Sequence, residues 1–288
     1  MAWPHGISRR RALRLAAGAA SLASLASLAA LARRAAADSY PSRPVHMMVG
    51  FPPGGTGDIV ARLMGQWLSE RMGQQVVIEN RPGAATNIAV EAALKAPADG
   101  YTLVQVTIST AINATLYDNP SFDLTRDIAM VGGGTDSPLV LEVNPALPVR
   151  SLPEFIAYAK ANPGKVTLGS FGIGTISHVT GELFKARAGI ETVHVPYRGT
   201  GPMLTDLLGG QIQAAFDVVA GSIGHIKAGR LRAIAVTTAQ RSAVLPEVPT
   251  VGETLPGFVA TGWLGLGVAR PTPGEIVARL NQIGRAHV

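Results

Sequence analysis

Short apolar runs alternate with helical periodicities along most of the chain. The run VHMMVGF at 45–51 is followed by proline and glycine, which is typical of a buried strand before a turn. Apolar residues between positions 59 and 72 recur at helical spacing, and Gly73 follows as a suitable helix end. Strand, turn and helix patterns recur at 75–96, and YTLVQVT at 101–107 predicts a third strand. The alternation predicts an α/β protein with a parallel sheet and helices on its faces.

A second series of the same kind begins at PLVLEVNP (138–145), after the glycine run at 132–134. Strands and helices alternate from there to LRAIAVTT (231–238). The last patterns, a strand in 258–271 and a helix starting in 273–281, are too few for a third domain. We therefore expect two α/β lobes that are joined by crossing strands and leave a ligand cleft between them. The expected lobe 1 spans 38–138 and 239–282, and the expected lobe 2 spans 139–238.

The first 37 residues have the composition of an export signal. A basic start precedes an apolar run at 15–32, and small residues end the segment, so we expect cleavage after Ala37. The arginine pair at 9–10 resembles a twin-arginine signal, and Sec export is the alternative. A membrane anchor is a further alternative, because the apolar run could just span a bilayer. Its alanine and serine content makes it only weakly hydrophobic.

The export segment also accounts for the basic character of the chain. The formal net charge is +6, with 25 basic and 19 acidic residues. The segment holds six of the basic residues and none of the acidic ones, so the remainder is formally neutral. This argues against nucleic acid as a partner. Cysteine is absent, which excludes disulfides and thiolate metal sites.

Two glycine-rich turns carry the candidate chemistry. FPPGGTGD (51–58) and SFGIGTISH (170–178) each lie between a predicted strand and a predicted helix. A helix start exposes main-chain N–H groups and the positive end of the helix dipole, so such a turn can bind an anion. On opposite lobes, the two turns would hold a small carboxylate between them. Neither turn has the G-K-[ST] ending of a P-loop. A dinucleotide site remains an alternative, because Glu191 has the spacing of a ribose-binding acid, although the glycine order is wrong.

Hydrolase and metal motifs are missing from the sequence. It contains no G-x-S-x-G and no H-E-x-x-H. His178 adjoins the second turn and either contacts a ligand or bonds the main chain at a helix start. His194 alternates with valines in a strand, which favours a structural role. His46 and His225 have no neighbours in the sequence that indicate metal ligation.

Two aspartates and one tryptophan leave similar alternatives open. Asp58 caps the first helix, offsets its dipole, or contacts an amino group of the ligand through water. Asp217 follows a buried strand, at the end where open α/β sheets bind ligands, and is either a ligand contact or a structural hydrogen-bond partner. We assign Trp263 to the core.

Several stretches in order along the chain resemble one family. They include YPSRPVHMMVGFPPGGTGDIVARL, VIENRPGAATNIA, GELFKARAGIETVHVPYRGTGPMLTDLLGGQI and RSAVLPEVPTVGE. Together they resemble the Bug receptors of tripartite tricarboxylate transporters (TctC-like), which are periplasmic solute-binding proteins. The resemblance implies a two-lobed, type II periplasmic-binding-protein-like fold (Venus flytrap), a small carboxylate ligand, lobe closure and no catalysis.

The resemblance also assigns ligand-binding positions. The family's first binding turn matches Phe51, Pro53, Gly54, Gly55, Thr56 and Asp58. Its opposite turn matches Ser170, Gly172, Gly174, Thr175, Ser177 and His178. Asp217 matches a strand end of the family, and the stretch containing Thr107, Ser109 and Thr110 matches a further strand-end loop. The family commonly has threonine where this chain has Gly57. The hydroxyl contact is therefore in doubt there, whereas the main-chain N–H groups are kept.

The expected function is that of a monomeric periplasmic receptor. It would bind a di- or tricarboxylate, an acidic amino acid or an aromatic acid, for permease subunits of a tripartite transporter or for sensing. We expect no cofactor, no metal and no nucleic acid partner. The alternative is an extracytoplasmic enzyme acting on carboxylate compounds. Residues 283–288 resemble a translated sequencing adapter, so we expect a truncated reading frame with a foreign tail.

Overall fold

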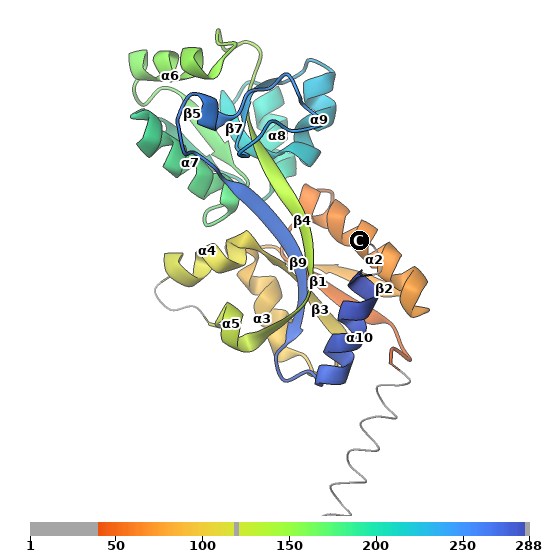
Figure 1. Cartoon of the computed structure of the whole chain (residues 1–288). Helices are drawn as coiled ribbons and strands as arrows, with labels where there is room; N and C mark the ends of the chain where they lie inside the picture. Colours follow the sequence, from red (N-terminus) through yellow and green to blue (C-terminus); the bar gives the residue numbers. More distant parts are fainter. Residues whose placement is uncertain (1–39, 118–120, 286–288) are drawn as a thin grey trace, which may run out of the picture. The chain divides into compact units, whose positions relative to one another are not determined.

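The computed structural model describes residues 40–117 and 121–285 (Figure 1). The predicted export signal at 1–37 and positions 286–288 of the predicted tail lie outside the described residues. A compact unit begins at Arg43 and holds the strands and helices described below. Within the described residues, no helix is both long and apolar enough to cross a membrane.

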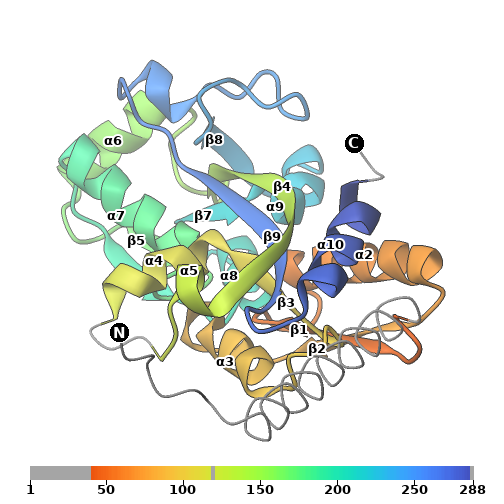
Figure 2. The same cartoon turned by 60° about the horizontal axis from the view of Figure 1, so that its bottom comes forward.

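The first lobe is built on three parallel strands in the order β2–β1–β3. These are β1 (Val45–Val49), β2 (Val76–Asn80) and β3 (Thr102–Thr107). Its helices are α2 (Thr56–Met72), the short η1 (Ala84–Thr86), α3 (Asn87–Lys95), α4 (Ile108–Leu116), α5 (Leu124–Asp127) and α10 (Gly274–Arg285). The last helix, α10, lies beside α2 in both views (Figures 1 and 2).

The second lobe repeats this plan. Strand β5 (Thr167–Ser170) lies between β6 (Val193–Pro196) and β7 (Ala214–Val218) and is parallel to both, and β8 (Arg232–Val236) pairs with β4. Its helices are α6 (Leu152–Ala161), α7 (Ile176–Ala188), α8 (Thr200–Leu208), α9 (Val219–Lys227) and the short η2 (Val251–Glu253).

Two long antiparallel strands join the lobes, as the sequence predicts. Strand β4 (Ile128–Val143) pairs with β9 (Thr261–Ala269) up to Pro138, and from Leu139 onward it pairs with strands of the second lobe. The predicted parallel pairing is found among β1, β2 and β3 and among β5, β6 and β7. The connecting strands β4 and β9 run antiparallel to their neighbours. A chain that leaves one lobe and returns must cross in opposite directions. The α/β, two-lobed fold is confirmed. The residue limits of the lobes stay predictions, but Val251 of η2 and Phe258, which those limits assign to lobe 1, pack in the core of the second lobe.

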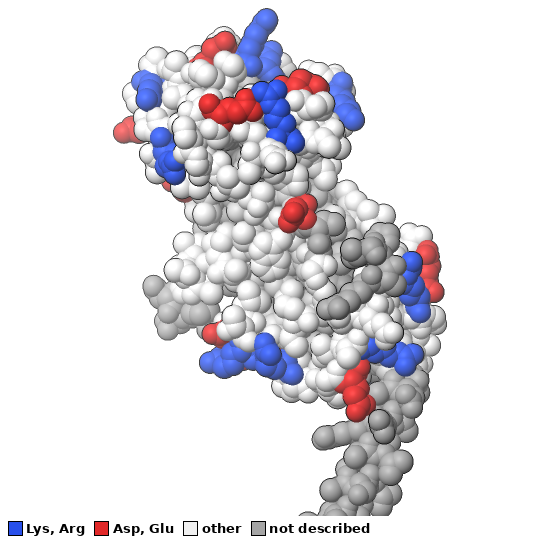
Figure 3. Space-filling view, viewed as in Figure 1, with Lys and Arg blue, Asp and Glu red and all other residues white. Residues whose placement is uncertain are grey.

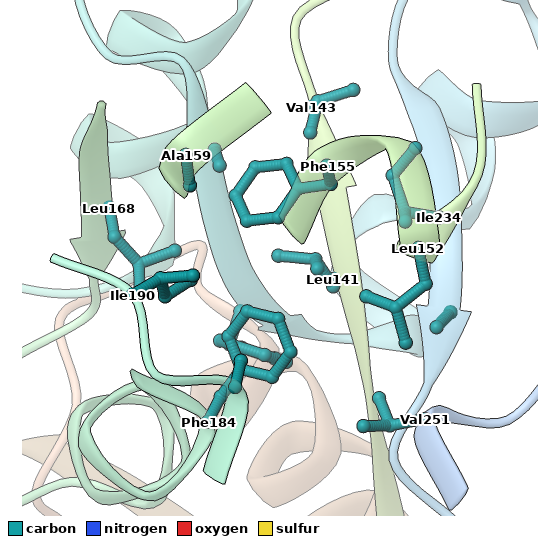
Figure 4. Close-up of a cluster of buried hydrophobic side chains, with 14 of the residues drawn as sticks. Leu141, Val143, Leu152, Phe155, Ala159, Leu168, Phe184, Ile190, Ile234 and Val251 are labelled. Carbon is teal, nitrogen blue, oxygen red and sulfur yellow. The ribbon is translucent and has the colours of Figure 1, made fainter. Parts of the chain in front are cut away.

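An aromatic cluster organises the core of the second lobe (Figure 4). The ring of Phe184 on α7 lies 6.1 Å from that of Phe155, 5.5 Å from that of Phe216 and 6.3 Å from that of Phe258. All four side chains are almost completely buried. Burial of one such ring contributes about 1.5–3 kcal/mol. The cluster thus fixes α7, and with it the second glycine-rich turn, against β7 and α6.

The start of α4 differs from the expectation. Residues 107–110 were expected to form a strand-end loop, and this prediction is wrong because α4 begins at Ile108. Thr107 accepts a hydrogen bond from the Ser109 N–H (3.2 Å), and the hydroxyl of Thr110 accepts from the Thr107 N–H (3.3 Å). This capping box uses threonine where glutamate or glutamine is usual, so the sequence carries only a weak sign of the helix start.

Candidate functional site

The first glycine-rich turn leads from β1 into α2 and leaves the helix start open. Gly54 has a φ of 79°, which favours glycine. Gly55 is the N-cap and provides no capping side chain. The helical hydrogen bonds begin with the Ile59 N–H, which donates to the Gly55 carbonyl (3.0 Å). The N–H groups of residues 56–58 therefore precede the first helical bond and are available to an anion.

The buried side chain of Asp58 stabilises this turn through hydrogen bonds. It is 2% exposed. Its Oδ2 accepts from the Gly54 N–H (2.9 Å) and from Arg62 Nε (2.9 Å), and its Oδ1 accepts from Asn80 Nδ2 (2.8 Å). Burial raises the pKa of Asp58, but the hydrogen bonds from Arg62, Gly54 and Asn80 outweigh it and lower that pKa. These contacts favour the structural alternative for Asp58.

We predict that Asp58→Asn lowers the free energy of unfolding by about 1.5 kcal/mol, because the negative charge that accepts three hydrogen bonds is lost and an NH2 group replaces one of the accepting oxygens. The measurement is urea unfolding of the ligand-free protein at pH 7. Glu70→Gln, at an exposed position on the same helix, is the control and should have no effect beyond about 0.5 kcal/mol. Unchanged stability in Asp58→Asn would contradict the structural role.

The second glycine-rich turn leads from β5 into α7. Gly172 and Gly174 have φ values of 145° and 78°. Thr175, the N-cap, donates its hydroxyl proton to the Gly172 carbonyl (2.6 Å) and does not cap the helix. Ser177 donates to the Phe216 carbonyl (2.5 Å) and is 1% exposed. The side chains of this turn thus hold its shape, and the helix start is again open.

Both turns border a cavity of about 80 Å³ between the lobes. Six of the sequence-predicted site residues line it: Phe51, Pro53, Gly55, Thr56, Thr107 and Ser109. The lining contains no charged side chain. Gly172 and Thr175 line a neighbouring, larger hollow of about 790 Å³, which Phe51 also borders. The remaining predicted residues line neither space: Gly54, Asp58, Thr110, Ser170, Gly174, Ser177, His178 and Asp217.

Helix starts converge on the cavity. Residues from the first turns of α2, α7 and α8 line it, as does Val218, the N-cap of α9. None of these four helices has a side-chain cap. The start of α4 also borders the cavity, but the side chains of the α4 capping box already accept hydrogen bonds from the N–H groups there. The hydroxyl of Thr56 is buried without a hydrogen-bond partner. The cavity is thus surrounded by main-chain donors and positive dipole ends, which suit an anion.

Two parts of this site were missed by sequence reasoning. The start of α8, at 199–202, lines the cavity, and the stretch YRGTGPM contained the signal: a strand, a glycine-bearing turn and a helix. Trp263 on β9 was assigned to the core. It packs partly against core residues and also lines the cavity. No local sequence pattern distinguishes a tryptophan in the core from one that lines a cavity.

Asp217 lies behind the cavity rather than in its wall. It is completely buried and accepts from the hydroxyl of Thr200, a lining residue (3.1 Å). Burial raises the pKa of Asp217 to about 6, against weaker lowering by hydrogen bonds from Ser222, Val218 and Thr200. Burial and the charge of Asp217 raise the pKa of Glu142, which Ser222 also contacts. In this position Asp217 positions the Thr200 hydroxyl at the helix start of α8.

His178 and His194 lie together beside the second turn. Their rings stack with centroids 4.4 Å apart. Nδ1 of His178 accepts from the Gly174 N–H (3.3 Å), as expected for a histidine bonded to the main chain at a helix start. Nε2 of His194 contacts the hydroxyl of Ser170 (2.7 Å). Burial lowers the pKa of both imidazoles. Both histidines therefore support the turn.

Charged side chains are interspersed on the face shown in Figure 3, where Lys and Arg lie among Asp and Glu. On that face they form no single basic patch. This arrangement agrees with the formally neutral composition beyond residue 37.

The fold and the cavity are those of two-lobed binding proteins. The family model "Tripartite tricarboxylate transporter family receptor" matches residues 60–287, and the chain belongs to this family. Protein BugT of Bordetella pertussis is 39% identical over 250 residues, which are 86% of this chain and 77% of BugT.

Two solved structures of relatives contain ligands. Rpa4515 of R. palustris, with adipate, has a TM-score of 0.81 and 39% identity, covering 85% of this chain and 82% of that one. MatC of Rhodopseudomonas palustris, with bound malate, has a TM-score of 0.81 and 31% identity, covering 86% and 85%.

Proposed function

We propose that this protein is an exported receptor that captures a small dicarboxylate between its lobes. The observation that carries the proposal is the convergence of four helix starts without side-chain caps on one cavity. An anion there would satisfy the open N–H groups that no protein side chain satisfies. The adipate and malate in the two relatives support a carboxylate as that anion.

The lining favours a ligand with an apolar middle. Phe51, Phe171, Ile176, Trp263 and Leu264 contribute to the walls, and no charged side chain does. Main-chain donors therefore bind the carboxylate, whereas the apolar walls enclose the carbon chain. This combination suits a dicarboxylate with methylene groups better than an amino acid, whose ammonium group would lack an acidic partner in the wall.

A thermal-shift screen tests the proposal. At a ligand concentration of about 100 times Kd, a dicarboxylate should add about 2.7 kcal/mol to the free energy of unfolding. For a protein of this size, this raises Tm by roughly 5–10 °C. The matched control is the diamide of each active dicarboxylate, which has the same shape without charge and should give no shift. Equal shifts with acid and diamide, or no shift with any carboxylate, would contradict the proposal.

The enzymatic alternative has a specific obstacle. The hydroxyl of Ser170 lies 2.7 Å from His194 Nε2, as a nucleophile lies beside a base. However, Ser170 is only 1% exposed and lines neither the cavity nor the larger hollow. The hydroxyl of Ser177 donates to the Phe216 carbonyl. These contacts favour binding over ester cleavage at the second turn. Ester turnover that Ser170→Ala abolishes would restore the alternative.

We further propose that the receptor works in the periplasm and serves a permease of the tripartite type. The export-like composition of residues 1–37 and the family membership support this proposal. Cell fractionation followed by N-terminal sequencing tests the export step, and a mature chain beginning at Asp38 is the expected result. A full-length chain retained in the membrane fraction would favour the anchor.

A further inference from the structure

Three side chains of metal-ligating type lie together in the second lobe, beside the second turn. His178 and Glu182 are one helical turn apart on α7, and His194 lies on β6. One ligand atom of each residue lies within 4.8 Å of those of the other two. Across residues 40–117 and 121–285, this is the one group of three such residues found at that spacing. None of the three lines the carboxylate cavity or the larger hollow, so they form a candidate ligand set separate from both.

The donor types suit a borderline divalent cation. Two imidazoles and one carboxylate form a ligand set that catalytic zinc sites use, with metal–ligand distances of about 2.0–2.2 Å. Such a cation brings its ligand atoms to about 3.5 Å from one another. Both histidines are half-buried, and the Glu182 side chain is 45% exposed. Because the two imidazole rings are stacked, one of them must turn out of the stack, and the Glu182 side chain must move toward it, before all three ligand atoms reach one cation. Oxygen-preferring cations such as Mg²⁺ fit this set poorly.

One of the two neutral tautomers of His194 leaves Nδ1 available to a cation. Nε2 of His194 lies 2.7 Å from the hydroxyl of Ser170, which also accepts from the Gly172 N–H (3.3 Å). A ring that donates from Nε2 to Ser170 has its lone pair on Nδ1, and a hydrogen bond of this kind commonly orients metal-binding histidines. In this tautomer His194 can bind a cation through Nδ1 and keep its contact with Ser170.

His178 would change its contact with the turn. Its Nδ1 accepts from the Gly174 N–H over 3.3 Å, a long hydrogen bond, so Nε2 carries the proton of the neutral ring. A cation at Nε2 replaces that proton, and the neutral ring then carries its hydrogen on Nδ1. The contact with Gly174 is lost, and its N–H group becomes free at the second turn.

Lys185 competes with a cation for Glu182. Its Nζ donates to both carboxylate oxygens, at 3.0 and 2.9 Å. A bound cation must displace this ammonium group, which weakens binding. Removal of the lysine charge should consequently strengthen binding, an effect that general damage to the fold would not produce.

We propose that His178, Glu182 and His194 form a binding site for Zn²⁺ or a chemically similar cation. The test is calorimetric titration of the purified, EDTA-treated protein with ZnCl2 at pH 7.5, with MgCl2 as the comparison. One Zn²⁺ should bind per chain. Glu182→Gln and His178→Asn should each weaken binding by at least about tenfold. Lys185→Gln should strengthen it about two- to fivefold.

The control variant is His46→Asn. His46 lies 2.6 Å from Glu79, and this His–Glu pair has no third metal-ligating residue beside it among the described residues. The variant therefore removes a histidine from a His–Glu pair outside the proposed site. It should leave Zn²⁺ binding unchanged. The proposal is overturned if no Zn²⁺ binds up to millimolar concentration, if neither site variant weakens binding, or if His46→Asn weakens it equally. Because EDTA is removed before the titration and no dicarboxylate is added, the result is independent of the proposed receptor function.

Discussion

Gly174→Ala is expected to weaken dicarboxylate binding by about 10- to 100-fold while the ligand-free protein stays folded. A Cβ at Gly174 would lie 2.7 Å from Oδ1 of Asn113, 3.0 Å from Cδ2 of Leu116 and 3.2 Å from Cβ of Ala85. All three residues belong to the first lobe, whereas Gly174 belongs to the second. Overpacking of this size costs about 1–3 kcal/mol, and it is imposed only when the lobes are together.

Movement of the Asn113 side chain would break two hydrogen bonds, because its Nδ2 donates to the Ala85 carbonyl (2.8 Å) and to Oδ1 of Asn87 (2.9 Å). The variant therefore shifts the population toward separated lobes. The apparent Kd rises in inverse proportion to the fraction of closed molecules. Calorimetry with the dicarboxylate that gives the largest thermal shift measures the change.

The matched control is Gly189→Ala at the end of the same helix. Gly189 also has a positive φ, 60°, but a Cβ there meets no atom within 4 Å. Both variants therefore introduce similar backbone strain, about 1 kcal/mol. Only Gly174→Ala should reduce affinity. Equal affinities in the two variants would show that contact at Gly174 does not limit closure.

Other close approaches between the lobes support the same interpretation. A Cβ at Gly199 would lie 2.9 Å from Cγ of Pro52, and one at Gly221 would lie 2.6 Å from the hydroxyl of Thr56. Gly199 and Gly221 belong to the second lobe, and their neighbours belong to the first turn. Small residues at such points let the two lobes approach each other around the cavity.

The glycine-rich turns could be predicted because their signals are local. Glycines next to a helical periodicity mark a helix start, and α2 does begin within the predicted turn. The second turn likewise leads into α7 at Ile176. The open N–H groups follow from the helix start itself and do not depend on distant residues.

Contacts between distant segments could not be predicted in the same way. The histidine pair is an example: Glu182 follows His178 by one helical turn, but His194 joins them only because β6 lies beside β5. The directions of β4 and β9 likewise depend on the return of the chain to the first lobe. Asp217 was placed correctly at a strand end, but its partner Glu142 comes from β4, 75 positions earlier.

Asp217 and Glu142 form a buried pair that must hold a proton. Oγ of Ser222 lies 2.9 Å from Oε1 of Glu142 and 2.9 Å from Oδ2 of Asp217. The hydroxyl has one proton and can donate to only one of them. The other contact requires a protonated carboxyl group. Burial and the charge of Asp217 raise the pKa of Glu142, which makes Glu142 the acid that donates to Ser222.

This pair should make the ligand-free protein less stable as the pH rises. Burial raises the pKa of Asp217 from 3.8 to about 6, so between these values the unfolded chain releases a proton that the folded protein keeps. The free energy of unfolding therefore falls from about pH 4 upward, and the decrease due to Asp217 is complete above about pH 6. A shift of this size corresponds to about 3 kcal/mol.

We therefore predict that Asp217→Asn raises the free energy of unfolding by up to about 3 kcal/mol at pH 8 and changes it little at pH 4. The asparagine can still accept from Thr200 and can donate to Ser222, while it carries no charge. Urea unfolding of the ligand-free protein at several pH values measures the difference between variant and parent. Asp136→Asn, an exposed position on β4, is the control and should leave the profile unchanged. A stability difference that is constant from pH 4 to pH 8 would show that Asp217 ionises as freely in the folded protein as in the unfolded chain.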